Sequence, residues 1–285
     1  MFKYRLISFP LLLLLAFAVV FYQPYGGYIF MVMALPVTAA AVWESGNIAR
    51  HLQLAVHRVL AVFAGVLIMM KYGIGPVFPQ YAEKFPDLLS LLTLVLVVLM
   101  LQTLFCREGR KIQAVVSALV TPGVMLFALL PAVALVRIYL GYGAMIFLSL
   151  VLATKASDTG GYIVGMLSNK LMKNGNHKIV PSISPKKSWE GTVGAALFSI
   201  GTAFLLVHFE CIDLGIAETL IFGFLAFLGS FAGDLTESQL KRAAGIKDSA
   251  NWIPGMGGIL DVLDSFIYNA PLFYLALAKG VLVCQ

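Results

Sequence analysis

Residues 112–136 read IQAVVSALVTPGVMLFALLPAVALV, and no charged residue occurs between Lys111 and Arg137. A helix of about 20 apolar residues crosses the ~30 Å hydrocarbon core of a bilayer, so this stretch is long enough to span a membrane. The chain as a whole is also rich in apolar residues. Of its 285 residues, 60% are hydrophobic and 12% are charged, whereas a soluble domain is about 25% charged. This composition excludes a soluble enzyme and a disordered chain, and it predicts an all-α polytopic membrane protein.

Hydropathy divides the chain into about nine transmembrane helices. The predicted spans are residues 6–21, 28–43, 54–70, 88–105, 112–136, 138–156, 192–209, 216–233 and 266–283. Two boundaries are weakly marked, because His57 and Arg58 lie near the start of the third span and only Arg137 separates the fifth from the sixth. We expect the first span to be a retained helix and not a cleaved signal peptide, since its apolar run continues past the Ala16-Phe17-Ala18 tripeptide.

The basic residues predict how the chain is oriented. With nine spans, sixteen of the twenty lysines and arginines fall on the side of the N-terminus and four on the other side. Basic residues are enriched in cytoplasmic loops, so we expect the N-terminus to be cytoplasmic and the C-terminus to lie outside. The net charge of +6 is explained by these loops, and it does not indicate a nucleic-acid partner.

Two long cytoplasmic loops, residues 156–191 and 234–265, hold most of the polar residues suited to chemistry. The second loop ends in Asp261-Val262-Leu263-Asp264, directly before the ninth span. Residues three apart share a face of a helix, so both carboxylates could hold one hard cation, and Asp234 at the end of the eighth span could supply a third. The alternative is that Asp261 and Asp264 only complement the dipole of a helix start.

Phosphate-binding features accompany this acidic pair. Backbone amides of glycine-rich turns can line a phosphate pocket, and cationic side chains lie nearby in the sequence. The residues concerned are Gly257, Gly258, Lys241, Arg242 and Lys247.

The first loop contains Ser184-Pro185-Lys186-Lys187-Ser188-Trp189-Glu190-Gly191. Ser-Pro before two lysines predicts a turn that presents Lys186 and Lys187 at the membrane surface. They could bind phosphates, or they could anchor the seventh helix against anionic lipid. The sequence alone leaves both roles open.

Residues 238–264, SQLKRAAGIKDSANWIPGMGGILDVLD, resemble the C-terminal signature of phosphatidate cytidylyltransferases, also called CDP-diacylglycerol synthases. The segments 158–160 (DTG), 184–191 (SPKKSWEG) and 233–238 (GDLTES) are similar to other marked stretches of that family. The resemblance is specific across residues 155–265 and only hydropathic across the first 150. Two positions depart from the pattern, since Met256 stands where a histidine is common and Val262 where an arginine is usual.

The resemblance implies an N-terminal region of five to six spans, residues 1–150, and a C-terminal catalytic region, residues 151–285. It implies an enzyme of phospholipid biosynthesis in the inner (plasma) membrane that transfers a cytidylyl group from CTP to phosphatidate, giving CDP-diacylglycerol and pyrophosphate. The active site would lie at the cytoplasmic interface. The implied partners are CTP, phosphatidate, the lipid bilayer and a second copy of the chain in a homodimer.

The resemblance also implies roles for single residues. The cofactor would be Mg²⁺, with room for a second, monovalent or divalent, cation. The expected metal ligands are Asp158, Asp234, Asp261 and Asp264, of which the last three act in catalysis together with Lys241 and Arg242. The expected substrate-binding residues are Ser184, Lys186, Lys187, Ser188, Ser238, Lys247, Gly257 and Gly258.

Two other functions are compatible with these residues. A CTP-dependent kinase acting on a polyprenol-type lipid alcohol would need similar nucleotide and metal contacts. A secondary transporter would place ionisable groups near the bilayer midplane, whereas these acids cluster at the edges of cytoplasmic loops.

Overall fold

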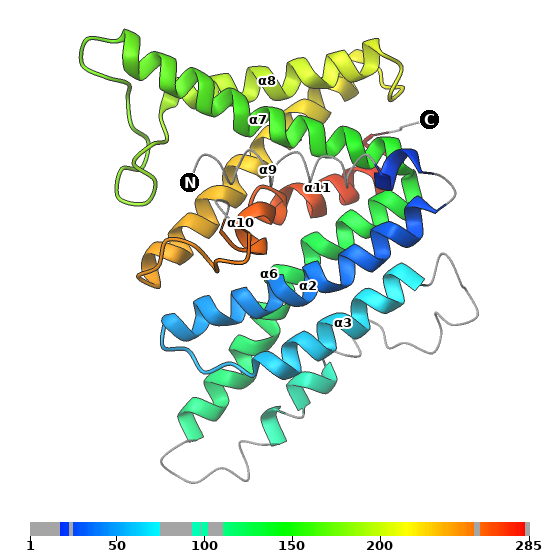
Figure 1. The fold of residues 1–285 in the computed structure, drawn as a ribbon, viewed down its shortest axis with the longest axis vertical. Helices are drawn as coiled ribbons and strands as arrows, with labels where there is room; N and C mark the ends of the chain where they lie inside the picture. The colour runs from blue at the N-terminus through cyan, green and yellow to red at the C-terminus, as the bar shows by residue number, and fades with distance from the viewer. Residues whose placement is uncertain are drawn as a thin grey trace. The chain divides into compact units, whose positions relative to one another are not determined.

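The computed structural model describes residues 18–22, 25–74, 93–97, 99–101, 111–253 and 257–282. Within these ranges the regular structure is helical, and the only β pairings are two isolated bridges. The expected all-α class is therefore confirmed for this part of the chain (Figure 1). The helices are α2 (Gly26–His51), α3 (Arg58–Ile74), α6 (Lys111–Tyr142), α7 (Ala144–Leu171), α8 (Trp189–His208), α9 (Ile216–Ala243), α10 (Ile259–Leu263) and α11 (Phe266–Ala278).

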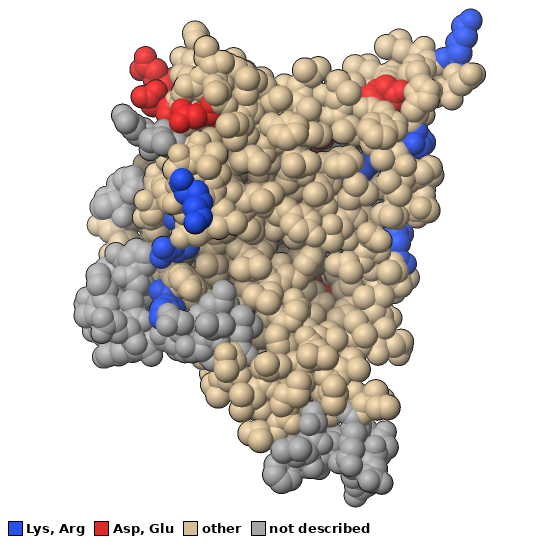
Figure 2. Space-filling view, turned by 180° about the vertical axis from the view of Figure 1, so that it is seen from behind, with Lys and Arg blue, Asp and Glu red and all other residues tan. Residues whose placement is uncertain are grey.

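Four helices, α2, α6, α8 and α9, are long and apolar enough to cross a membrane. Their surfaces suit lipid, since Val193, Leu197 and Leu205 of α8 are all more than half exposed. Most of the described surface seen in Figure 2 is uncharged, and the charged side chains form small separate patches on it. The chain is a multi-pass membrane protein. The predicted first and fourth spans lie mostly outside the described residues, so the count of nine stays a prediction.

Several predicted boundaries are wrong. The fifth and sixth spans meet at Gly143, whose φ of 103° breaks the helix, and not at Arg137. Helix α7 continues to Leu171 and α9 to Ala243, so the first parts of both predicted loops are helical. Hydropathy marks where apolar character ends, whereas helical hydrogen bonding continues into polar sequence once a helix is established.

The chain forms two compact units. Unit 1 comprises Met1–Leu140 and Leu240–Leu263, and unit 2 comprises Gly141–Gln239 and Asp264–Gln285. The units are not divided at residue 150, the expected boundary between the N-terminal and catalytic regions, so that division stays a prediction. In unit 1, α2 packs on α3, and the core includes the fully buried Val42, Ile68 and Leu129.

In unit 2, α7 and α8 lie side by side (Figure 1) because glycines face one another. A Cβ atom on Gly194 would lie 2.9 Å from the carbonyl oxygen of Gly160, and one on Gly191 would lie 2.8 Å from that of Gly161. Small residues allow this approach of two backbones in membrane helices. Elsewhere in the unit, Phe222 and Phe273 are fully buried and pack edge to face at 4.6 Å.

Candidate active site

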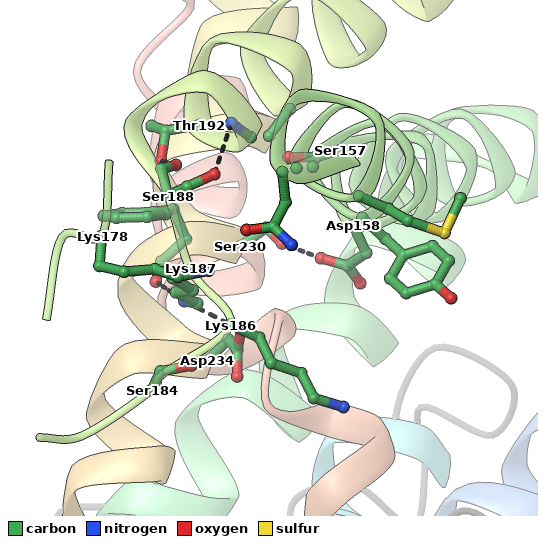
Figure 3. Close-up of a pocket in the computed structure, with 18 residues that line it drawn as sticks. Ser157, Asp158, Lys178, Ser184, Lys186, Lys187, Ser188, Thr192, Ser230 and Asp234 are labelled. Atoms are coloured by element: carbon green, nitrogen blue, oxygen red, sulfur yellow. Dashed lines mark hydrogen bonds and ion pairs between the residues drawn. The ribbon is translucent and has the colours of Figure 1, made fainter. Parts of the chain in front are cut away.

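Unit 2 contains a cavity of about 420 Å³, within the size range of small-molecule sites. It lies between α7, the start of α8, the loop before α8, and the middle of α9 (Figure 3). Its charged lining residues are Asp158, Lys178, Lys186, Lys187 and Asp234. Its apolar lining includes Tyr162, Met166, Ala195 and Phe231. The cavity thus offers cations to an anionic group and an apolar wall to a hydrocarbon.

The loop that carries the lysines is held at both ends. Its backbone pairs with itself, because Ile179 N–H donates to the Lys187 carbonyl at 3.2 Å. The Ser188 hydroxyl accepts from Gly191 N–H at 3.1 Å and so caps α8, which is a common role for serine at this position. Ser188 is buried and also lines the cavity. The serine expected to contact substrate therefore also fixes the end of the lysine loop.

Lys187 and Lys186 have different surroundings. The Lys187 ammonium lies 2.9 Å from an Asp234 carboxylate oxygen, and its side chain is 17% exposed. It also lies over the Phe231 ring at 4.5 Å. Lys186 is exposed, and its side chain has no hydrogen bond or ion pair among the described residues. Asp234 also accepts from Ser238 at 3.3 Å, so these two predicted residues share one turn of α9.

Two other carboxylates of unit 2, those of Asp158 and Asp264, are joined by a serine. The Ser265 hydroxyl lies 2.9 Å from oxygens of both Asp158 and Asp264. Ser230 donates to the other Asp158 oxygen at 2.5 Å (Figure 3). The Lys155 ammonium lies 3.1 Å from Asp158 and 3.4 Å from the Ser265 hydroxyl. The structure thus brings two of the expected metal ligands, Asp158 and Asp264, to one hydroxyl.

The electrostatics of this pair perturb Asp264. Burial, together with the charges of Asp234 and Asp158, raises the pKa of Asp264 to about 6. The Lys155 ammonium and the hydrogen bond with Ser265 oppose this rise. A carboxyl group with such a raised pKa is common at functional sites, because a binding site that gathers like charges disfavours ionisation.

Asp261 belongs to unit 1 and has the opposite environment. The Lys241 ammonium lies 2.5 Å from one of its oxygens, and both side chains are nearly buried. The other oxygen accepts from Gly258 N–H at 2.7 Å and from both Ser249 N–H and the Ser249 hydroxyl at 2.9 Å. Although burial acts to raise it, the pKa of Asp261 is lowered by Lys241, Gly258 and Ser249.

The expectation that Asp261 and Asp264 open one helix is wrong. Helix α10 ends at Leu263 and α11 begins at Phe266, so Asp264 lies in the turn between them. Asp261 reaches back to Gly258 N–H in the manner of a capping box, which fits the alternative role of a helix-start residue. A joint metal-binding role of the pair stays a prediction.

The remaining predicted residues of unit 1 fall into two groups. Arg242 and Lys247 are exposed, as suits residues expected to meet a soluble substrate. Gly257 N–H donates to the Ile253 carbonyl at 3.1 Å, and Gly258 N–H donates to Asp261. The two glycine amides expected to line a phosphate pocket are therefore donors within the chain, and their phosphate-binding role stays a prediction.

The sequence of residues 3–279 matches the model of the cytidylyltransferase family. The chain belongs to this family. Similar proteins include phosphatidate cytidylyltransferase 4, chloroplastic, of Arabidopsis thaliana, which is 43% identical over 119 residues, 42% of this chain and 29% of the relative. The phosphatidate cytidylyltransferase of Haemophilus influenzae is 36% identical over 136 residues, 46% of this chain and 45% of the relative. That of Mycobacterium bovis is 40% identical over 128 residues, 45% of this chain and 40% of the relative.

The aligned stretches thus cover less than half of each of these three relatives and less than half of this chain. Neither a lipid-alcohol kinase nor a transporter is favoured by these similarities. The resemblance read from the signature motifs is confirmed at the level of the cytidylyltransferase family.

The donor set of this family member suits magnesium. Mg²⁺ takes oxygen ligands, and enzymes commonly bind it through one or two carboxylates, with phosphate and water oxygens completing the shell. Asp158 and Asp264 supply such carboxylates at one hydroxyl in unit 2. Among the described residues, no three acidic, histidine or cysteine side chains gather to hold an ion by themselves. The fit is therefore to a cation that substrate oxygens help to bind.

Several residues of the polar networks were missed by the sequence analysis, among them Ser249, which contacts Asp261 and the buried Glu44 of α2. Lys155 and Ser230 lie one helical turn from Asp158 and Asp234 respectively, and Ser265 directly follows Asp264, so spacing alone could have suggested them. Glu44 had a weaker signal, a single acid at the edge of the apolar second span. Its contacts come from residues more than 200 positions away in the chain, which no local pattern reveals.

Proposed function

We propose that this protein transfers a cytidylyl group from CTP to phosphatidate and releases pyrophosphate. The cavity of unit 2 carries the proposal, because it combines three lysines and two aspartates with an apolar wall. Phosphatidate is complementary to this lining, because its phosphate could contact the lysines and its hydrocarbon chains could contact the apolar wall. The names of the similar proteins support the choice of substrates.

In the proposed reaction, an oxygen of the phosphatidate phosphate attacks the α-phosphorus of CTP. A new P–O bond forms there, the bond from the α-phosphorus to the bridging oxygen of the β-phosphate breaks, and pyrophosphate leaves. A phosphate monoester has a second pKa of about 6, so the nucleophile is largely ionised at neutral pH and needs no strong general base. Lys186 and Lys187 would offset the charge that gathers on the phosphates, and Lys178 would share this role.

Asp158 and Asp264 would hold Mg²⁺ in unit 2 together with phosphate and water oxygens. A metal-binding role of Asp234, which pairs with Lys187, stays a prediction. The ion would supply charge neutralisation for the phosphate oxygens. Ser265 and Ser230 would keep the Asp158 carboxylate in a fixed orientation through their hydroxyl hydrogen bonds. A second cation, a role for Asp261 in metal binding, and a homodimer stay predictions from the resemblance.

The proposal is tested with purified protein in detergent, CTP labelled at the α-phosphate, and one lipid acceptor at a time. We expect labelled CDP-diacylglycerol and an equal amount of pyrophosphate with phosphatidate, and no product with diacylglycerol or a polyprenol. Phosphorylation of the alcohol would favour the kinase alternative instead. Absence of turnover with phosphatidate, for protein that remains folded and supplied with Mg²⁺, would contradict the proposal.

The proposed reaction needs the lysine loop on the cytoplasmic side, where CTP is found. In a background lacking Cys106, Cys211 and Cys284, a cysteine replacing Asn174 should resist an impermeant thiol reagent in intact cells. A cysteine replacing Val281 should react if the C-terminus lies outside. Labelling at position 174 from outside would contradict both the predicted orientation and the proposed use of CTP.

A further inference from the structure

Glu44 is a fully buried carboxylate in α2, and none of the motifs of the sequence analysis includes it. One of its oxygens accepts from Ile259 N–H at 2.9 Å. The other accepts from Leu260 N–H at 2.8 Å and from the Ser249 hydroxyl at 2.7 Å. A buried carboxylate is costly unless hydrogen bonds replace its water. Here three donors do so, and all three come from the segment that contains Asp261.

The hydrogen bonds of Glu44 determine where α10 starts. Ile259 and Leu260 are the first two residues of this helix, and their N–H groups have no acceptor within the helix. Glu44 provides that acceptor from another helix. The approach is close, since a Cβ atom on Gly258 would collide with both the Glu44 carboxylate and the Ser249 hydroxyl. Only glycine fits between Glu44 and the start of α10.

Ser249 connects Glu44 to Asp261. Its hydroxyl lies 2.7 Å from a Glu44 oxygen and 2.9 Å from an Asp261 oxygen. A hydroxyl has one proton to donate, and Asp261 already receives N–H donors from Gly258 and Ser249. Both carboxylates lie within hydrogen-bond distance of this hydroxyl, which donates its proton to one of them at a time. Asp261 in turn contacts the Lys241 ammonium.

We propose that Glu44 is a positioning residue, which fixes Asp261 and through it Lys241 by holding the start of α10 and the Ser249 hydroxyl. The proposal rests on the proposed function, because Asp261 and Lys241 belong to the signature that is expected to bind CTP. A carboxylate is required at position 44, because all three neighbouring groups donate. The amide nitrogen of a glutamine would place a fourth donor among them.

The first experiment compares wild-type protein with Glu44→Gln. Hydrogen–deuterium exchange of peptides covering residues 257–264 should be at least about tenfold faster in the variant, while α8 peptides exchange as before. Outer-shell substitutions typically reduce activity by about 10- to 100-fold, so we expect a loss of that size in kcat/KM for CTP. The thermal midpoint in detergent identifies any general loss of folding, which would speed exchange in all helices.

Ser45→Ala is the matched control. Ser45 is the next residue of α2 and is also buried, but among the described residues its hydroxyl bonds only to the Ala41 carbonyl of the same helix, at 2.8 Å. This variant should keep wild-type kinetics and wild-type exchange at residues 257–264. If Ser45→Ala and Glu44→Gln changed both readouts equally, Glu44 would have only a packing role and the proposal would be overturned.

A double-mutant cycle tests the connection through Ser249. If Glu44 acts on Asp261 through this hydroxyl, Ser249→Ala should also lower kcat/KM for CTP. The double variant should then have the same kcat/KM as Glu44→Gln alone, because the effects of coupled residues are not additive. Fully additive losses would overturn the connection. Should Glu44→Gln not fold, Ser249→Ala alone decides, since unchanged exchange and kinetics in that variant would contradict the proposal.

The exchange readout separates this proposal from the proposed function. If wild-type protein converts neither CTP nor phosphatidate, the reaction is wrong, yet exchange at residues 257–264 still reports whether Glu44 holds α10. If the protein is active and Glu44→Gln changes neither readout, the positioning role fails while the reaction stands.

Discussion

The two units of this cytidylyltransferase-family protein each contain a network of carboxylates and cations, and the networks differ in openness. In unit 2, Asp158, Asp234 and the lysines line a cavity that a ligand can enter. In unit 1, the oxygens of Glu44 and Asp261 accept hydrogen bonds from the chain itself. The first network suits binding and the second suits holding a backbone turn in place.

The two aspartates of the DVLD motif show what this difference does. Asp264, beside other carboxylates, has its pKa raised to about 6. Asp261, beside Lys241 and backbone donors, has its pKa lowered. The same residue type, three positions apart, is thus readily protonated in one unit and held as a carboxylate in the other. The charge of Asp264 is only partly offset by Ser265 and Lys155, so a bound cation would stabilise its ionised form. The charge of Asp261 is already balanced by Lys241 and backbone donors.

The largest expected contrast is between Asp264→Asn and Asp261→Asn. Asp264→Asn removes the repulsion from Asp158 and Asp234, so the protein should fold with unchanged or higher stability. Its turnover should fall by about 100-fold or more, which is the usual effect of removing one charge-stabilising group from an active site. Asp261→Asn removes the carboxylate partner of a buried ammonium, which costs about 3–5 kcal/mol. We expect a strongly lowered thermal midpoint and poor yield. Equal stability of the two variants, or near-normal activity of Asp264→Asn, would contradict the comparison.

The next contrast tests how α7 and α8 frame the cavity. A Cβ atom on Gly194 would lie 2.5 Å from the Val164 side chain and 2.9 Å from the Gly160 carbonyl, so Gly194→Ala should separate the helices. Overpacking of this kind costs about 1–3 kcal/mol, which the thermal midpoint measures. Gly201→Ala in the same helix meets nothing within 4 Å and should be neutral or slightly stabilising. Similar behaviour of the two variants would mean that the close approach is not needed.

The lysines of the cavity can be distinguished from lysines that only face anionic lipid. If Lys186 and Lys187 bind phosphates, replacing both with Gln should raise the KM for CTP about tenfold, equivalent to about 1.4 kcal/mol of binding. Replacing Lys170 and Lys173, which are exposed and absent from the cavity lining, with Gln serves as the control. A lipid-anchoring role predicts equal, small effects in both double variants, with changes in membrane yield only.

The smallest expected effect is a pH dependence set by Asp264. Because its pKa is about 6, activity that needs this carboxylate should rise as pH increases through about 6. Its contribution to stability runs the other way, since the folded protein holds this proton more tightly than the unfolded chain and loses that advantage as pH rises through about 6. Higher Mg²⁺ should shift the activity midpoint to lower pH, because cation and proton compete. An unchanged midpoint in Asp264→Asn would exclude Asp264 as its source.

The sequence by itself determined the helical membrane class and the family. Apolar blocks long enough to span a bilayer and the spacing of the signature residues are local properties, readable without coordinates. Local spacing also placed Ser188 beside the lysines. The helix turn that Asp234 and Ser238 share was not predicted, because a loop was expected from residue 234 onward.

Only the tertiary structure decided which charges are compensated. The contacts of Glu44 with Ser249, Ile259 and Leu260 join parts of the chain more than 200 residues apart, and the Ser265 hydroxyl meets Asp158 across 107 residues. The ionisation of a carboxyl group depends on burial and on the charges within a few ångströms. Those neighbours are set by packing, so sequence spacing could name Asp261 and Asp264 as a pair but could not tell which of them the fold leaves available.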